Sequence, residues 1–343
     1  MTLGKRRGTG AEAARNLLLA AARFSMAERM ITTVTGDIPD SELGATLAHE
    51  HLYCDISVHS GRADNRLDDV AEVVGEMEWF SRAGGRTIIE VTPEGIGRDA
   101  AKLRDISVAS GVRVVSGIAF YDQSTYPDWV RSASAETIAD YFVRHLEEGE
   151  NGVRAGLIGE VMSHNEPVPN AAGYRLEPLE RRVFVAAALA QRRTGVAIST
   201  HASLGRAGHA QLDVLEQEGA DLSRVVIGHC DAHVHDDIEL DLAYYLPILQ
   251  RGAFCQFDMI GWEMLAPDEA RAERIAALVR LGHARKITLS TDTCRRSQFR
   301  RNGGRGYDYL WTSFLPRLRR WGVTEEQIRL MLVDAPRALL ARA

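Results

Sequence analysis

The sequence predicts a (β/α)8 TIM barrel of the α/β class, in a single domain with an N-terminal extension. Eight short runs rich in β-branched and apolar residues recur between residues 45 and 292, separated by longer stretches of helical periodicity. Most of these runs are almost continuously apolar, as expected for parallel strands buried on both faces. Glycines follow most of the helical stretches, where a C-terminal cap is expected.

The predicted strands follow one another along the chain. They are 45–51, 87–92, 113–119, 156–161, 196–201, 225–229, 253–258 and 287–292. The clearest amphipathic helices between them are 68–82, 135–148, 177–193, 209–218 and 268–281. A doubly wound sheet with a second domain is the alternative, because one sequence shows neither strand order nor closure. The sequence contains no internal repeat, proline-rich linker or low-complexity stretch that would mark a second domain.

Residues 1–30 are set apart from the barrel, which is predicted to occupy residues 31–343. They hold six basic and two acidic residues, so the remaining chain has a net charge of about −10. Charged residues interrupt the short apolar run in this segment, which makes a secretory signal a poor interpretation. An extension, or a start codon placed upstream of Met26 or Met30, explains it better.

The composition is that of an ordinary globular protein, with 45% hydrophobic and 26% charged residues. The formal net charge of −6 argues against a nucleic-acid partner. No apolar run approaches the roughly 20 residues of a membrane-spanning helix, so no membrane partner is expected. The four cysteines are widely spaced without a CxxC pair, which favours a reducing compartment, the cytoplasm, over a disulfide framework.

Metal-ligating residue types end several of the predicted strands. His49 and His51 end the first strand as an HxH pair, and alternate residues on a strand point to the same face. In this architecture, functional groups gather at the carboxyl ends of the strands. Taken alone, the pair is weak evidence, because a surface loop or a hydrogen-bonded histidine pair fits it as well.

The fourth, fifth, sixth and eighth strands also end in ligand residue types. These residues are Glu160, His201, His229 and Asp292. Six ligands exceed the four of a closed structural zinc site, so two divalent ions sharing a carboxylate fit better than one. Zinc is expected, with manganese or cobalt as alternatives.

In this order, these residues resemble the phosphotriesterase family of the amidohydrolase superfamily. The likeness spans about residues 30–340 and includes ATLAHEHL, VVSGIAFY, LIGEV and GGRGYDYLWTSFLPRLRRWGV. The resemblance implies that His49 and His51 ligate the more buried metal. It implies that His201 and His229 ligate the more exposed one, with Asp292 beside the bridging solvent.

Glu160 departs from the pattern of many family members, which carry a carboxylated lysine at this bridging position. A glutamate also presents two oxygens to two cations, and one branch of the family uses it. The resemblance therefore points away from paraoxon-like phosphotriesterases. It points toward branches that include sugar lactonases and N-acyl amino-acid amidases.

Four further residues are candidates for contact with substrate. Tyr121 resembles a family tyrosine beside the metals, although a core aromatic fits as well. Arg295 and Arg296 could hold an anionic group through their planar guanidinium groups, unless they belong to a solvated basic loop. Trp262 is either an apolar wall of the pocket or a residue that packs on a helix.

The predicted reaction is attack by a metal-activated hydroxide on a small molecule, a lactone or related carboxylic ester. Asp292 would take the proton and deliver it to the leaving group, unless it only coordinates. The alternatives are an N-acyl amino-acid amidohydrolase, a promiscuous phosphotriesterase and, from another class, a non-catalytic scaffold. A homodimer is expected only by analogy with the resembling family.

Overall fold

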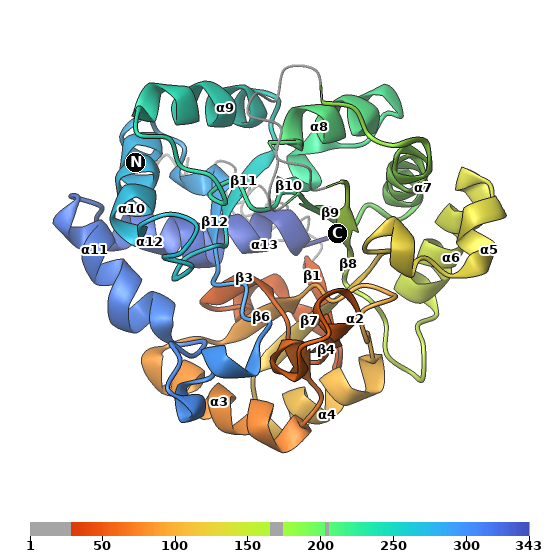
Figure 1. The fold of residues 1–343 in the computed structure, drawn as a ribbon, viewed down its shortest axis with the longest axis horizontal. Helices are drawn as coiled ribbons and strands as arrows, with labels where there is room; N and C mark the ends of the chain where they lie inside the picture. The colour runs from red at the N-terminus through yellow and green to blue at the C-terminus, as the bar shows by residue number, and fades with distance from the viewer. Residues whose placement is uncertain (1–28, 165–173, 203–205, 343) are drawn as a thin grey trace, which may run out of the picture.

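Eight parallel strands close into a barrel that a ring of helices surrounds (Figure 1). The computed structural model describes residues 29–164, 174–202 and 206–342. The strand order follows the chain, β3-β6-β7-β8-β9-β10-β11-β12, and β12 returns to lie beside β3. The (β/α)8 prediction is therefore confirmed, and the alternative of a doubly wound sheet is wrong.

The predicted strands and helices appear close to their predicted positions. The barrel strands are β3 (Thr46–Glu50), β6 (Thr87–Glu90), β7 (Arg113–Ile118), β8 (Leu157–Met162), β9 (Ala197–His201), β10 (Val225–Ile227), β11 (Phe254–Phe257) and β12 (Ile287–Leu289). The longer helices are α3 (Val70–Ala83), α4 (Ala100–Ser110), α6 (Ala135–Glu147), α7 (Pro178–Thr194), α8 (Gly208–Gln217), α9 (Ile238–Gln250) and α10 (Asp268–Arg280). The short C-terminal helices are α11 (Leu315–Arg320), α12 (Glu325–Arg329) and α13 (Ala335–Leu340).

Local hydrogen bonds explain where the helices begin and end. Asp69 precedes α3, and its carboxylate accepts hydrogen bonds from the backbone N–H groups of Ala71 and Glu72. Gly84 ends the same helix in the left-handed conformation, which a residue with a side chain adopts at a cost. The capping residues thus agree with the periodicity of the sequence.

A hairpin that the sequence analysis does not predict closes the amino-terminal end of the barrel. It consists of β1 (Met30–Thr33) and β2 (Gly36–Pro39). Met30 and Arg342 exchange backbone hydrogen bonds of 2.8 and 2.9 Å, so the hairpin meets the end of α13. Ile31 packs there with inward-facing strand residues such as Val115 in one buried apolar cluster.

Because this cluster fills one end, the polar groups of the interior gather at the carboxyl ends of the strands. The predicted extension lies outside the described residues up to residue 28. Within the described ranges, none of the helices is both long enough and apolar enough to cross a membrane.

Candidate metal centre and substrate pocket

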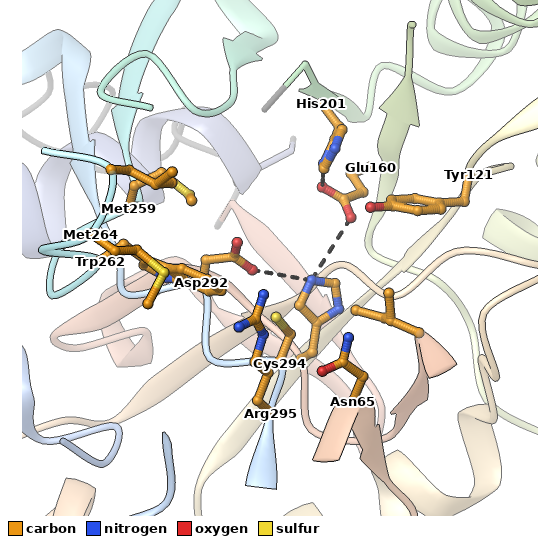
Figure 2. Close-up of a pocket in the computed structure, with 13 residues that line it drawn as sticks. Asn65, Tyr121, Glu160, His201, Met259, Trp262, Met264, Asp292, Cys294 and Arg295 are labelled. Atoms are coloured by element: carbon orange, nitrogen blue, oxygen red, sulfur yellow. Dashed lines mark hydrogen bonds and ion pairs between the residues drawn. The ribbon is translucent and has the colours of Figure 1, made fainter. Parts of the chain in front are cut away.

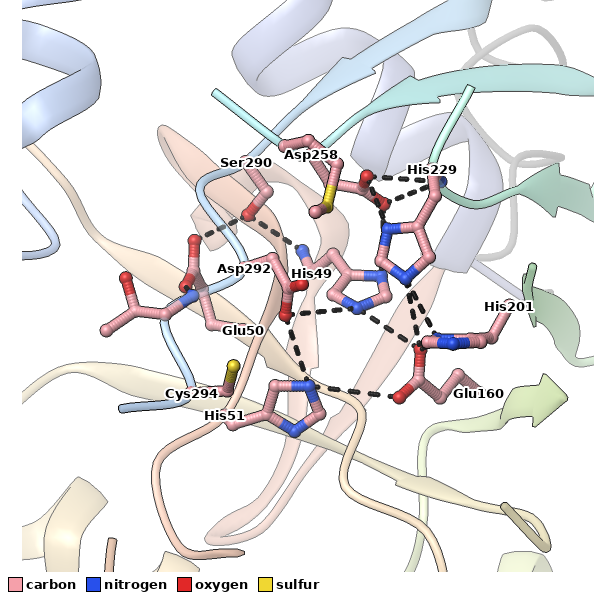
Figure 3. Close-up of polar contacts among 12 residues, drawn as sticks. His49, Glu50, His51, Glu160, His201, His229, Asp258, Ser290, Asp292 and Cys294 are labelled. Carbon is pink, nitrogen blue, oxygen red and sulfur yellow. Dashed lines mark hydrogen bonds and ion pairs between the residues drawn. The ribbon is translucent and has the colours of Figure 1, made fainter. Parts of the chain in front are cut away.

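The ends of five strands bring the six predicted ligands to one point (Figure 3). The pairing register shifts between Leu47 and Glu50 in β3, and again between Ile158 and Val161 in β8. Such irregularities bend a strand and redirect its side chains, and they are common next to active sites. The shift in β3 lies at His49, and the shift in β8 lies at Glu160.

Two of the ligands lie just beyond their strands in an uncommon backbone conformation. His229 follows β10 with a φ of 52°, and Asp292 follows β12 with a φ of 46°. Residues with side chains rarely adopt these left-handed angles, which cluster at functional sites. Both side chains turn toward the centre of the ligand cluster (Figure 3).

Glu160 lies at the middle of the cluster and is buried. Its Oε2 atom lies 2.9 Å from Nδ1 of His201 and 3.2 Å from Nε2 of His49. The same oxygen lies 4.0 Å from Nε2 of His229, while Oε1 lies 3.8 Å from Nε2 of His51. One carboxylate therefore faces all four predicted histidine ligands.

Two overlapping trios have the geometry to hold a metal ion. One consists of His49, Glu160 and His229, and the other of His49, His51 and Asp292; in each, the ligand atoms lie within 4.8 Å of one another. His201 adjoins the first trio, because its Nδ1 lies 2.8 Å from Nε2 of His229. All these residues are buried.

The donor set fits divalent metal ions of the zinc type, which prefer imidazole and carboxylate ligands. Among the described residues, Nε2 of His49 and Oδ1 of Asp292 are buried and lie in ion-pair contacts of 3.2 to 3.8 Å, but neither takes part in a well-directed hydrogen bond. Buried polar atoms without hydrogen bonds are costly, and a cation between them would satisfy both. We find that the residues present fit a metal centre.

A second layer of polar groups orients the histidines. Asp258 accepts a hydrogen bond of 2.8 Å from Nδ1 of His229, and Thr92 lies 2.8 Å from Nδ1 of His51. With Nδ1 engaged, each imidazole presents Nε2 to the centre. The sequence analysis does not name Asp258, although it ends the seventh predicted strand and so carries the same signal as the ligands.

The charges of the cluster keep its carboxylates ionised. Burial alone would raise the pKa of Glu160, but electrostatic contacts and hydrogen bonds with His201 and His49 hold that pKa well below its usual value. Burial also acts against ionisation of Asp292, whose pKa is nevertheless lowered by contact with His51 and by the other histidines. Both groups are therefore acceptors at neutral pH.

A pocket opens above the cluster, with walls of different character (Figure 2). Met259, Trp262, Met264 and Leu265 form an apolar wall in the loop after β11. Tyr121 lies across from this wall with its hydroxyl directed toward the cluster, and its ring centroid is 5.1 Å from that of His201. Burial raises the pKa of Tyr121 well above its ordinary value, so the hydroxyl keeps its proton.

The structure separates the two arginines that the sequence analysis pairs. Arg295 lines the pocket, and its guanidinium lies 4.8 Å from the centroid of the Trp262 ring. Arg296 is not among the described residues that line the pocket. It forms an ion pair of 2.6 Å with Glu72 on α3, so the surface-loop interpretation fits Arg296.

The model of the phosphotriesterase family matches residues 29–340. This chain belongs to the phosphotriesterase family. Members of this family are hydrolases with a binuclear divalent metal centre, and the family assignment with the ligand trios makes the chain a metal-dependent hydrolase. The resemblance predicted from the strand-end motifs is thus confirmed.

Three relatives illustrate the range of this phosphotriesterase family. The phosphotriesterase homology protein of Escherichia coli is 38% identical over 85% of this chain and 96% of its own. Its crystal structure, with phosphate in the active site, has a TM-score of 0.80 and covers 87% of this chain and 99% of that one.

The other two relatives act on carboxylic acid derivatives, as their names state. The N-acetyltaurine hydrolase of Dictyostelium discoideum is 31% identical over 80% of this chain and 74% of its own. A lactonase structure from Listeria monocytogenes is 25% identical, with a TM-score of 0.79, and covers 91% of this chain and 98% of that one.

Proposed function

We propose that this chain hydrolyses a lactone or related carboxylic ester at a binuclear centre of divalent ions, with zinc as the first choice. The observation that carries the proposal is the convergence of two ligand trios, sharing His49, below a substrate-sized pocket. The proposed ligands are His49, His51, Glu160, His201, His229 and Asp292. Their filled positions disfavour a non-catalytic scaffold.

Divalent cations held there would lower the pKa of a water molecule and polarise a substrate carbonyl. The carboxylate of Asp292 lines the pocket and is ionised, so it can accept a proton from the attacking water. The same carboxylate can then return the proton to the leaving oxygen. Tyr121, which stays protonated, can donate a hydrogen bond to the substrate from the opposite side.

The pocket wall bears on the kind of acyl group. Trp262 and Met259 are buried in the wall, while Met264 is 78% exposed at its rim. A polyhydroxylated sugar would leave hydroxyl groups without partners against such a surface, whereas an apolar acyl chain would gain from burial. The wall therefore favours a lactone or ester with an apolar acyl part.

A second candidate is hydrolysis of an N-acyl amino acid or a similar acyl amide with an anionic end. The observation that favours it is Arg295, whose guanidinium lines the pocket beside Trp262 and could hold a carboxylate or sulfonate. The likeness to an N-acetyltaurine hydrolase supports the same candidate. Amides and esters differ in the leaving group, to which Asp292 would deliver the proton in either case.

The test measures proton release from matched panels of lactones, N-acyl amino acids and phosphotriesters, with zinc-, manganese- or cobalt-loaded full-length chain. Asp292→Asn is the blank, because it keeps the shape of the side chain while removing the proton acceptor. We expect lactones to be turned over fastest and the blank to lose about 100-fold or more of the rate. Exclusive cleavage of amides would replace the ester proposal, and inertness toward all three panels would refute it.

A further inference from the structure

Glu50, the residue between His49 and His51, is directed toward the segment that follows β12 (Figure 3). Its Oε1 atom accepts hydrogen bonds from Oγ of Ser290 at 2.8 Å and from both N and Oγ1 of Thr291 at 2.7 Å. Its Oε2 atom accepts one from the backbone N–H of Thr293 at 2.7 Å. Both oxygens of the carboxylate are therefore engaged, Oε1 by three donors and Oε2 by one.

The donors come from residues on both sides of Asp292, in a segment about 240 residues further along the chain. Asp292 has a φ of 46°, and a side-chain-bearing residue keeps such an angle only where its surroundings fix it. Glu50 supplies that fixation, because it holds the backbone N–H groups of both neighbours, Thr291 and Thr293.

The carbonyl side of the same segment is held as well. The carbonyl of Thr291 accepts a hydrogen bond of 2.9 Å from Nε1 of Trp262 and another from the guanidinium of Arg305. The peptide before Asp292 is thus fixed through its N–H and its carbonyl by separate groups. Of these groups, Glu50 alone lies on the strand that carries two of the proposed metal ligands.

We infer that Glu50 is a positioning residue that fixes Asp292 relative to His49 and His51. The inference rests on the proposed function, in which these three residues hold one of the metal ions. Glu50 touches neither the pocket nor the ligand atoms in the contacts described; it acts through its hydrogen bonds to Thr291 and Thr293. Its carboxylate links β3 to the segment that follows β12 by hydrogen bonds at this site.

Glu50→Gln tests the inference in the full-length chain titrated with cobalt(II). The amide replaces one acceptor oxygen with an N–H donor, which must face either the backbone donor of Thr293 or the three donors from Ser290 and Thr291. We expect cobalt affinity to weaken by about 10- to 100-fold, the usual effect of losing a group that orients a ligand. The visible absorption of bound cobalt should shift, and kcat should fall more than KM rises.

Thr291→Val is a milder second variant, because it removes one of the four donors and preserves the side-chain shape. It should change affinity and spectrum in the same direction by a smaller amount. If Glu50→Gln does not fold, this variant decides the question. Cobalt affinity and absorption identical to those of the unmodified chain would then overturn the inference.

Glu76→Gln is the matched control. Glu76 is also a buried carboxylate and accepts backbone hydrogen bonds from Arg300 at 2.8 Å and Arg301 at 3.1 Å, but it lies on α3. We expect this change to lower the unfolding temperature without altering the cobalt spectrum or affinity. Equal effects of the two substitutions, or no effect of Glu50→Gln on cobalt binding, would overturn the inference. Cobalt binding needs no substrate, so failure of the hydrolysis assays would leave this result interpretable.

Discussion

At the scale of single residues, Glu160 connects both parts of the proposed metal centre. Its Oε2 atom lies near His49 and His201, and its Oε1 atom faces His51. We expect Glu160→Ala to lose most of the bound metal and about 100-fold or more of the hydrolytic rate, while the barrel stays folded. Metal per chain is measured by elemental analysis, and folding by circular dichroism.

Glu160→Gln provides the control for side-chain volume, because it keeps one oxygen and nearly the same shape. It should retain more metal than Glu160→Ala, since a neutral amide oxygen is a weaker ligand than a carboxylate but is still a donor. A full complement of metal in Glu160→Ala would show that the carboxylate does not bridge.

The sequence predicts the convergence of the ligand residues because their positions follow from one rule, that parallel strands present their last residues at the same edge. Asp258 also satisfies that rule. Only the structure shows that it accepts a hydrogen bond from His229. Glu50 is different, because its partners lie about 240 residues away and no local pattern indicates them. Arg295 and Arg296 are adjacent in sequence, yet the local turn sends only Arg295 into the pocket.

At the scale of elements, β9 ends in His201, His229 follows β10, and the two strands approach each other closely. A Cβ atom added to Gly228 would lie 2.1 Å from the carbonyl oxygen of Thr200, far inside contact distance. We expect Gly228→Ala to force the strands apart, to destabilise the fold by about 1 to 3 kcal/mol and to reduce metal binding. Thermal unfolding and metal content measure the two effects.

Gly75→Ala is the comparison for that change, because Gly75 lies within α3 and an added Cβ atom meets only an arginine side chain at 4.0 Å. It should leave metal content unchanged and raise stability slightly, since alanine favours a helix over glycine by up to about 1 kcal/mol. Similar losses in both variants would argue against the strand contact as the cause.

The five named helices could be predicted because each has one apolar face and ends at a recognisable cap. Helix α9 could not, because its apolar residues leave no clear polar face and Pro247 lies inside it. The hairpin of β1 and β2 is short, and its contacts are with the far end of the chain. Such elements owe their stability to tertiary packing, which periodicity does not encode.

At the scale of the whole molecule, the barrel depends on joining the two ends of the chain. The segment that follows β12 is joined to β3 by hydrogen bonds such as that from the backbone N–H of His49 to Oγ of Ser290 at 2.9 Å. At the opposite end of the barrel, the backbone N–H of Val34 in the hairpin donates a hydrogen bond of 2.9 Å to the carbonyl of Val114. Met30 and Arg342 exchange backbone hydrogen bonds at the same end. The end of the barrel away from the pocket is therefore closed by residues from both termini.

Two shortened chains distinguish the contribution of the predicted extension to stability from that of the hairpin that closes the barrel. A chain that begins at Arg29 keeps the hairpin, and we expect it to match the full-length chain in unfolding temperature and metal content. A chain that begins at Asp40 loses Ile31 and Val34, which are 1% and 2% exposed, and with them about 3 to 6 kcal/mol of apolar burial. Its unfolding temperature should fall sharply. A loss of stability or metal already in the chain beginning at Arg29 would mean that the first 28 residues belong to the folded domain.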